Sequence, residues 1–185
     1  MIRRPPRSTQ SRSSAASDVY KRQDNTVIVY EQAVFFVRGQ PIESVRIASP
    51  FSLLIADTGI SASTRTAVTD VRLLVENQPE MALPVLRAIG DLVVEARQAL
   101  ADGDLIQLGR LMNRNHDCLK MLTVSSPELD CLVNAAQSAG ALGAKLSGGG
   151  RGGNMIALAS TDRVSQVEKA LLAAGAACVF HTIVH

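Results

Sequence analysis

The 185-residue sequence contains no tryptophan, only three cysteines and only 3% aromatic residues. Cys118, Cys131 and Cys178 lie far apart and form no CxxC pair, which excludes a disulfide-stapled scaffold and a cysteine-rich zinc site. The longest apolar runs are too short to cross a bilayer, which excludes a membrane-spanning protein. Unpaired cysteines and the lack of a credible secretory signal predict a cytoplasmic location.

With 46% hydrophobic and 19% charged residues, the chain can bury a core, which excludes a wholly disordered protein. The length predicts one domain or slightly more. Residues 1–23 hold six of the 19 basic side chains but only one of the 17 acidic ones. The remainder is mildly acidic and lacks the basic stripe that nucleic-acid-binding proteins need, so no nucleic-acid partner is expected.

The first 23 residues are rich in Arg, Ser and Pro and have no apolar periodicity, which predicts a disordered segment. An organelle transit peptide and a basic arm for an acidic partner are two interpretations of this tail. The third, which we favour, is that RSSAASDVYKRQ is translated sequencing-adapter read-through and not native sequence. The protein's own sequence would then begin at Asp24 and belong to a longer chain.

Beyond the tail, β-branched and short apolar runs predict strands, and helical spacing of Leu and Val predicts helices. Ser63 and Ser126 are predicted N-caps, and Pro84 fits a helix only in its first turn. The mixture predicts an α+β fold, an antiparallel sheet with helices packed on one face. A hairpin or two short strands are predicted at 26–37, and further strands at 44–47, 51–56, 144–147, 155–159 and 178–184. Helices are predicted from 63 to the stop at 77–79, and at 81–100, 105–122, 126–138 and 161–174.

The segment from Lys145 to Asn154 reads KLSGGGRGGN, with five glycines within six residues between two predicted strands. Glycine can adopt positive φ, and successive N–H groups can form a nest for an anion such as phosphate. The spacing is neither that of a Walker A loop nor that of a dinucleotide fingerprint. The sequence therefore predicts phosphate or nucleotide contact here, and a flexible linker is the alternative.

This segment resembles the glycine-rich third motif of the GHMP kinases. Three further segments, 24–27, 55–68 and 111–130, resemble the mevalonate kinases of that superfamily in the same order. The resemblance covers Asp24 to the end and implies the carboxy-terminal half of such a kinase. It implies a strand remnant of the amino-terminal part at 24–62 and a ferredoxin-like carboxy-terminal domain at 63–185.

The resemblance implies phosphoryl transfer from ATP–Mg²⁺ to the terminal hydroxyl of mevalonate. Asp24 matches the catalytic aspartate, and Ser63 and Thr64 match the border of the mevalonate pocket, where helix capping is an equally good interpretation. His116 is expected to be a packed helix residue. The nucleotide phosphates would lie under the loop formed by Ser147, Gly148, Gly149, Gly150, Arg151, Gly152 and Gly153.

Several features depart from the family pattern. Arg151 replaces a usual Gly, where it could pair with a phosphate oxygen or point to solvent, Asn154 replaces the common Cys, and Ala62 replaces a basic residue of some members. The first two family motifs are absent from these 185 residues, and the main Mg²⁺ ligands are expected there, with no metal ligand in this chain. We therefore predict that the chain alone is inactive, although a full-length kinase could form a homodimer.

Two alternatives stay open at this point. The chain could belong to another GHMP kinase, such as a phosphomevalonate kinase. It could instead be a non-catalytic α+β module that binds a small phosphate-bearing molecule. An Asp24 carboxylate on the same face as the glycine loop, near Ser63 and Thr64, would favour the kinase, and a distant Asp24 would favour the module.

Overall fold

The computed structural model describes residues 33–37 and 39–185, which fall into two compact units, one up to Arg46 and one from Ile47 to His185. In the first unit, β1 (Val34–Phe35) pairs antiparallel with β2 (Glu43–Ser44). The tail, Asp24 and most of the predicted strand region 26–37 lie outside the described residues. The division of the chain at residues 24 and 63 stays a prediction.

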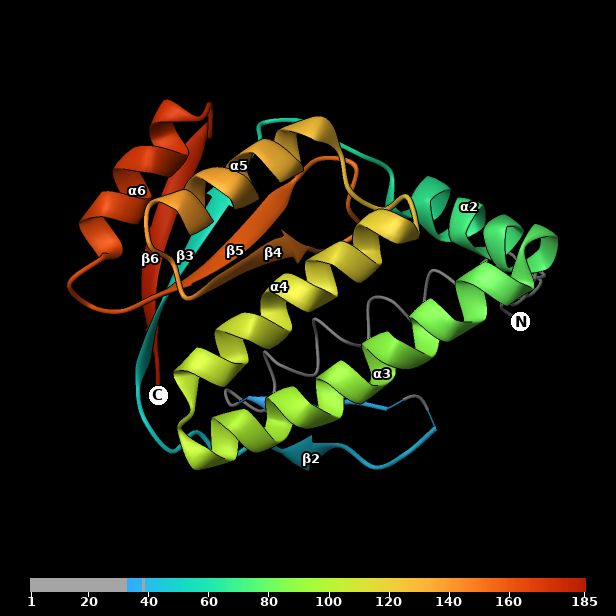
Figure 1. Cartoon of the computed structure of the whole chain (residues 1–185), viewed down its shortest axis with the longest axis horizontal. Coiled ribbons are helices and arrows are strands. Elements are labelled where there is room, and N and C mark those ends of the chain that lie inside the picture. The colour runs from blue at the N-terminus through green and yellow to red at the C-terminus, as the bar shows by residue number, and fades with distance from the viewer. Residues whose placement is uncertain (1–32, 38) are drawn as a thin grey trace, which may run out of the picture. The chain divides into compact units, whose positions relative to one another are not determined.

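The second unit is built around a four-stranded antiparallel sheet with the order β4-β5-β3-β6 (Figure 1). β3 (Phe51–Asp57) is central, paired with β5 (Asn154–Ala159) on one side and β6 (Cys178–Val184) on the other. β4 (Gly143–Ser147) pairs with β5 and forms an edge. The antiparallel sheet predicted from the sequence is confirmed.

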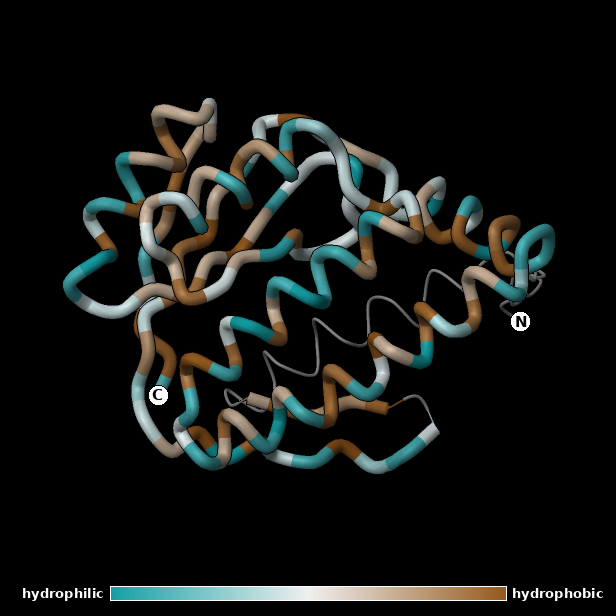
Figure 2. The backbone as a smooth tube through the Cα atoms, viewed as in Figure 1, coloured by the Kyte–Doolittle hydropathy of each residue, from teal (hydrophilic) through white to brown (hydrophobic). Residues whose placement is uncertain are grey.

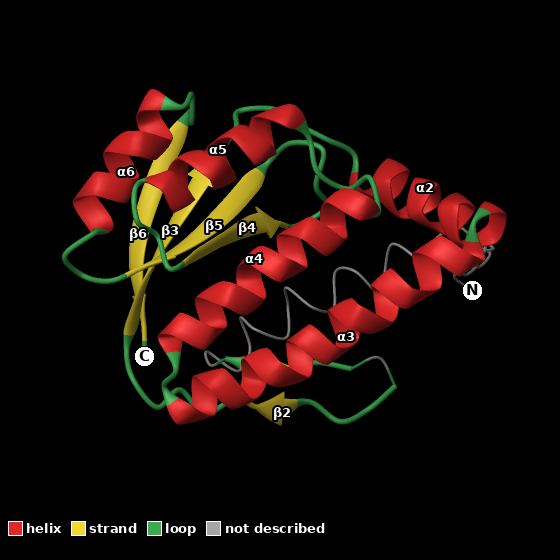
Figure 3. Ribbon diagram, viewed as in Figure 1, coloured by secondary structure: helices red, strands yellow, loops and turns green. Residues whose placement is uncertain are grey.

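Two helices complete a ferredoxin-like arrangement. The chain runs β3, α5 (Pro127–Ser138), β4, β5, α6 (Val164–Ala173), β6, which is the βαββαβ order of that fold. Ser126 caps α5 by accepting the Leu129 N–H at 3.3 Å, as its sequence pattern predicts. α5 and α6 lie on the same face of the sheet (Figure 3).

Three further helices are inserted between β3 and α5: α2 (Thr64–Asn77), α3 (Pro79–Asp102) and α4 (Leu105–Met121). α3 and α4 pack side by side, and α4 runs along β4 (Figure 1). Gly103 ends α3 in the left-handed conformation with φ of 73°. Pro84 lies inside α3 rather than in its first turn, contrary to the sequence expectation. It is tolerated because it is exposed, so the carbonyl it leaves unpaired can reach water.

The main core fills the space between the sheet and α5 and α6. Alternate residues of the strands face these helices, and the buried set includes Leu54, Ala56, Leu146, Met155, Ala157, Leu129, Leu132, Val133, Val167 and Leu171. A second cluster joins α3 and α4 to the other sheet face through Leu158. Figure 2 shows hydrophobic and hydrophilic residues alternating along α3 and α4, as expected of helices with one buried side. Within the described part of the chain, no helix has the length and apolar character needed to cross a bilayer.

Candidate functional site

The glycine-rich segment forms the loop between β4 and β5, whose last paired residues are Ser147 and Asn154. Four of its glycines have positive φ: Gly148 at 85°, Gly150 at 74°, Gly152 at 134° and Gly153 at 71°. L-residues with side chains rarely adopt this conformation. The composition of the loop is therefore a backbone requirement and not a sign of a linker.

Three glycines of the loop are also required by close packing. A Cβ on Gly149 would lie 2.6 Å from Thr64 Oγ1, one on Gly150 would lie 2.1 Å from the Val124 carbonyl oxygen, and one on Gly152 would lie 2.6 Å from the Ile60 carbonyl oxygen. By contrast, Cβ positions on Gly148 and Gly153 meet nothing within 4 Å. One side of the loop is thus pressed against the protein while its two ends leave open space beside the backbone.

Hydrogen bonds hold the loop to the segment that follows β3. The Gly153 N–H donates to the Ile60 carbonyl at 2.8 Å, and the Gly153 carbonyl accepts the Thr58 N–H at 2.9 Å and the Thr58 hydroxyl at 3.0 Å. On the other side, the Arg151 N–H donates to the Val124 carbonyl at 2.8 Å. The loop is fixed from both sides, as a preorganised binding loop would be.

Arg151 is a non-glycine residue of the loop with positive φ, at 59°. A left-handed conformation at such a residue costs about 1–3 kcal/mol unless its surroundings fix it. Its guanidinium forms an ion pair with Asp70 of α2 through Nη1, and its Nε donates to the Thr123 carbonyl at 3.2 Å. The side chain therefore lies against protein groups and does not simply point to solvent. Its role as a nucleotide ligand stays a prediction.

Of the predicted residues Ser63 and Thr64 at the start of α2, Thr64 lies beside this loop. Ser63 caps α2 by accepting the Thr66 N–H at 3.4 Å, so the capping interpretation is confirmed. The side chain of Thr64, the first residue of α2, packs against Gly149. The N-terminus of a helix attracts anions because its N–H groups and dipole point outward. The structure therefore brings together a glycine loop and a helix N-terminus, two elements that suit a phosphate group.

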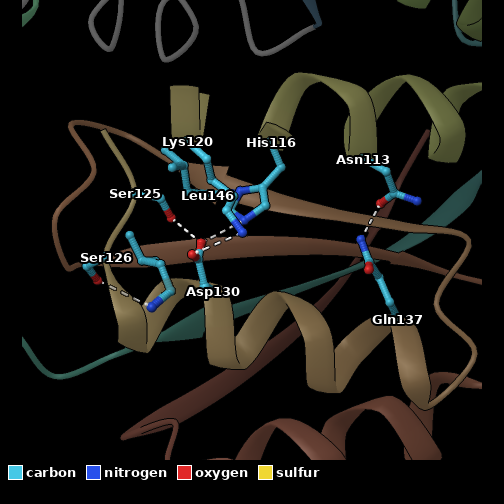
Figure 4. A network of polar contacts seen from close by, with 9 residues as sticks. Asn113, His116, Lys120, Ser125, Ser126, Asp130, Gln137 and Leu146 are labelled. Atoms are coloured by element: carbon cyan, nitrogen blue, oxygen red, sulfur yellow. Dashed lines mark hydrogen bonds and ion pairs between the residues drawn. The ribbon is translucent and has the colours of Figure 1, made fainter. Parts of the chain in front are cut away.

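The strand that leads into the loop is held by side chains of α4 (Figure 4). β4 is an edge strand, so the N–H groups on its outer side need acceptors. Asn113 Oδ1 accepts the Ala144 N–H at 2.8 Å, and His116 Nδ1 accepts the Leu146 N–H at 3.3 Å. Two side chains one helical turn apart thus satisfy two alternate N–H groups of the strand.

His116 is buried, as the sequence predicts for a packed histidine, with 4% of its surface exposed. Its Nε2 lies 3.1 Å from Asp130 Oδ1, and Asp130 also accepts from the Ser125 hydroxyl at 2.6 Å and pairs with Lys120 at 3.2 Å (Figure 4). Because Nδ1 accepts from Leu146, the proton of the neutral ring belongs on Nε2, facing Asp130. This network joins α4 and α5, and it contacts β4 at Leu146, just before the glycine loop.

The protonation states in this network follow from burial and contacts. Burial lowers the pKa of His116, and the nearby Asp130 carboxylate only partly opposes this effect. Partial burial acts to raise the pKa of Asp130, but hydrogen bonds from Ser125 and Lys120 outweigh it, so the pKa lies below its ordinary value. A neutral His116 beside an ionised Asp130 is thus the favoured state near neutral pH.

Lys145, the first residue of the glycine-rich motif, lies next to residues of α3 and α4. Burial lowers its pKa, and its side chain lines a cavity of about 130 Å³ between α3 and α4, with Leu92, Met112 and Asn115 among its walls. A larger cavity of about 380 Å³ lies beside α5 and is lined by Thr58, Cys131 and Gly175 among others. The loop residues 148–153 line neither of these two cavities.

Residues 96–177 match the family described as GHMP kinases C terminal. Mevalonate kinase of Thermococcus onnurineus is 44% identical over 128 residues, covering 66% of this chain and 38% of that protein. Mevalonate kinase of Thermococcus sibiricus is 40% identical over 157 residues, covering 82% of this chain and 46% of the relative. Residues 96–177 are thus similar to the C-terminal region of the GHMP kinases. The chain therefore spans less than half the length of these two relatives.

A solved structure is similar over most of the chain. The crystal structure of L. major mevalonate kinase in complex with R-mevalonate matches with a TM-score of 0.84 at 36% identity, covering 88% of this chain and 52% of that chain. The α+β fold predicted from the mixture of strands and helices is thereby confirmed.

The structure brings together some of the predicted site residues. Thr64 lies against the loop at Gly149, and Ser63 is its neighbour in the chain, whereas Asp24 lies outside the described residues, so its place relative to the loop stays a prediction. Sequence reasoning did not identify Asn113, which binds β4 directly, or Asp130, which binds His116, as residues that hold the strand before the loop. The spacing of Asn113 and His116 by three residues on one helix was the available signal, but the edge strand they contact lies about 30 residues away. Among the described residues, no group of three or more His, Cys, Asp or Glu side chains is arranged to hold a metal ion.

Proposed function

We propose that the chain is part of a mevalonate kinase, which transfers the γ-phosphoryl group of ATP to the terminal hydroxyl of mevalonate. The relatives named mevalonate kinase, up to 44% identical, support this substrate. The observation that carries the proposal is the junction of the glycine loop with the N-terminus of α2, in a fold with a TM-score of 0.84 to a mevalonate kinase. The activity is proposed for the whole protein, since the chain spans about half the length of its relatives.

The residues that we assign to the nucleotide are those of the loop, Ser147 to Gly153. The open space beside Gly148 and Gly153 suits a ligand that approaches the backbone closely, and backbone N–H groups can donate to phosphate oxygens. α2 has no acidic residue in its first turn, so nothing there opposes an anion. These features fit the triphosphate of ATP, which as its Mg²⁺ complex supplies the phosphoryl group. We place the main Mg²⁺ ligands in the part of the kinase upstream of this chain.

The residues that we assign to mevalonate and to catalysis are Ser63, Thr64 and Asp24. The adjacency of Thr64 and Gly149 supports a substrate pocket that borders the phosphate loop. In this proposal the Asp24 carboxylate lies beside the acceptor hydroxyl and accepts its proton as negative charge moves to the phosphoryl group. A carboxylate in this position acts mainly by orientation, because phosphoryl transfer depends on positioning and charge neutralisation.

The test is to read the gene upstream of the Asp24 codon, express the complete product and assay it with ATP. We expect ADP release that depends on mevalonate, and a loss of at least about a hundredfold in kcat in Asp24→Asn. Phosphomevalonate, homoserine and galactose serve as control acceptors. Release of ADP with phosphomevalonate but not with mevalonate would reassign the substrate, and no acceptor-dependent release would refute the kinase proposal.

The same gene sequence tests the interpretation of the tail. Upstream codons for a small Pro-Ser-Gly-like segment in place of Lys21-Arg22-Gln23 are expected if the tail is read-through. The prediction that the 185 residues alone do not phosphorylate mevalonate is tested in the same assay. A homodimer of the complete product, also proposed, is tested by its mass in solution.

A further inference from the structure

The side chain of Arg151 is not used in the role proposed for the glycine loop, which depends on backbone N–H groups. It is the only charged residue between Gly148 and Gly153, and it adopts a left-handed conformation with φ of 59° that glycine would adopt without strain. An arginine at such a position needs contacts that glycine could not make.

Arg151 connects three separate segments. Its backbone N–H donates to Val124 at 2.8 Å, its Nε donates to Thr123 at 3.2 Å, and its Nη1 pairs with Asp70 in the middle of α2. The partners belong to the turn after α4 and to α2, which are 53 or more residues apart in sequence. The side chains of Arg151 and Asp70 are only 31% and 38% exposed, so solvent screens this pair less than a fully exposed one.

Two contacts of the loop, with Thr64 and with Asp70, lie on the same helix. Gly149 packs against Thr64 at the start of α2, and Arg151 pairs with Asp70 further along it. The contact of Gly149 with Thr64 involves no side chain of the loop, whereas the Arg151–Asp70 pair is a polar side-chain contact. The guanidinium therefore supplies the polar attachment of the loop to α2.

We propose that Arg151 is a positioning residue, which acts through Asp70 to hold the glycine loop against α2 in one conformation before a ligand binds. Its effect on a nucleotide, which rests on the function proposed above, is then indirect. The loop's backbone, held in place by the Arg151–Asp70 pair, receives the phosphate groups. This role differs from that of a direct phosphate ligand, in which Arg151 would act alone and Asp70 would compete for it.

The two roles are separated by variants of both partners. Arg151→Asn removes the cation and keeps a residue type that tolerates positive φ, and Asp70→Asn removes the carboxylate with little change of shape. Glu76→Gln is the matched control, because it removes one exposed carboxylate of the same helix. Asp70→Glu keeps the carboxylate and is expected to retain most of the effect.

The first measurement is amide hydrogen exchange of the 185-residue chain without nucleotide. We expect Arg151→Asn and Asp70→Asn each to speed exchange in a peptide covering 147–154 about fivefold, as loss of a partly buried ion pair allows. The double variant should exchange no faster than either single one, and Glu76→Gln should match the unchanged chain. Exchange in α4 reports whether each variant stays folded. Unchanged loop exchange in Asp70→Asn would overturn the proposal.

The second measurement is the KM for ATP of the complete kinase. A positioning role predicts that Asp70→Asn and Arg151→Asn raise this KM by similar factors, about fivefold, without additivity. A rise in Arg151→Asn alone, with Asp70→Asn unchanged or lower, would identify a direct phosphate ligand and overturn the proposal. A complete product that phosphorylates no acceptor would refute the proposed function, whereas the exchange measurement would still decide the role of the Arg151–Asp70 pair.

Discussion

His116 and Leu146 are linked by a hydrogen bond in which the imidazole Nδ1 accepts the backbone N–H of the edge strand at 3.3 Å. Leu146 is buried and immediately precedes Ser147, where the glycine loop begins. The bond requires His116 to be neutral, because a protonated Nδ1 would present a second donor to the Leu146 N–H. The protonation of one side chain of α4 is thereby coupled to the strand that carries the loop.

This coupling predicts a loss of stability on mild acidification. The pKa of His116 is lowered in the folded chain, so the unfolded chain binds more protons as pH falls below the ordinary histidine value of about 6.5. The free energy of unfolding should decrease from there until the folded pKa is reached, and then level off with respect to this group. Urea unfolding at pH 7.5 and pH 5 measures the change.

A variant without the imidazole provides the control for that measurement. In His116→Asn the amide oxygen can still accept from Leu146 but does not titrate, so the decrease between pH 7.5 and pH 5 should become smaller. Asp130 does not contribute to this decrease, because its pKa is lowered and the stability that it provides is lost only at more acidic pH. An equal decrease in the variant would mean that other groups cause the acid sensitivity.

Asn113 supports the same strand and predicts a difference between two substitutions. Its Oδ1 accepts both the Ala144 N–H and the Gln137 amide, each at 2.8 Å. Asn113→Leu leaves a buried N–H without an acceptor, and should lower the free energy of unfolding by about 1–3 kcal/mol. Asn113→Asp keeps an acceptor oxygen and should cost less. Chemical denaturation of the two variants at pH 7.5 compares them, and equal losses would show that the hydrogen bonds contribute nothing specific.

Sequence reasoning succeeded where the determinants are local. The apolar run at Cys178–Val184 is a strand with the predicted bounds, and Ser126 followed by Pro127 marks the start of α5. A short apolar run indicates a strand, and a cap residue followed by proline indicates a helix start, from only a few neighbouring positions. The family resemblance then supplied the arrangement of these elements.

The contacts that hold the glycine loop could not be predicted in this way. The Arg151–Asp70 pair spans 81 residues and the His116–Leu146 bond spans 30, and no periodicity relates such positions. Arg151 could be recognised as a departure from an all-glycine loop, but its partner depends on how α2 packs. The placement of Pro84 inside α3 likewise depended on which side of the helix faces solvent.

The contact between α4 and β4 predicts opposite effects for two glycine substitutions. A Cβ on Gly143 would lie 2.1 Å from the Gly109 carbonyl oxygen, whereas one on Gly90 in α3 would meet nothing within 4 Å. Gly143→Ala should destabilise the fold by about 1–3 kcal/mol, because backbone atoms must move apart. Gly90→Ala should raise stability by about 0.5–1 kcal/mol through helix propensity. Thermal unfolding of both variants is the measurement, and a loss of stability in both would contradict this account of Gly143.

The packing of Gly149 on Thr64 predicts how the loop responds to a single methyl group. Gly149 does not have positive φ, so Gly149→Ala is opposed by the 2.6 Å approach to Thr64 Oγ1 rather than by backbone strain. The methyl group should push the loop away from α2 and, in the complete kinase, reduce kcat/KM for ATP about tenfold, because small displacements of positioning groups are costly.

The size of the Thr64 side chain decides whether that explanation is correct. Thr64→Ala removes the Oγ1 atom that the new methyl group would meet, so Gly149→Ala combined with Thr64→Ala should lose less kcat/KM for ATP than the product of the two single losses. Gly148→Ala is the comparison, since its Cβ meets no protein atom within 4 Å, so any loss comes from its φ of 85° or from the nucleotide and not from Thr64. Thr64→Ala should give it no relief. If Thr64→Ala reduced the loss of kcat/KM in both glycine variants, or in neither, the contact of Gly149 with Thr64 would not explain the effect of Gly149→Ala. Backbone conformation would then be the main requirement of the loop.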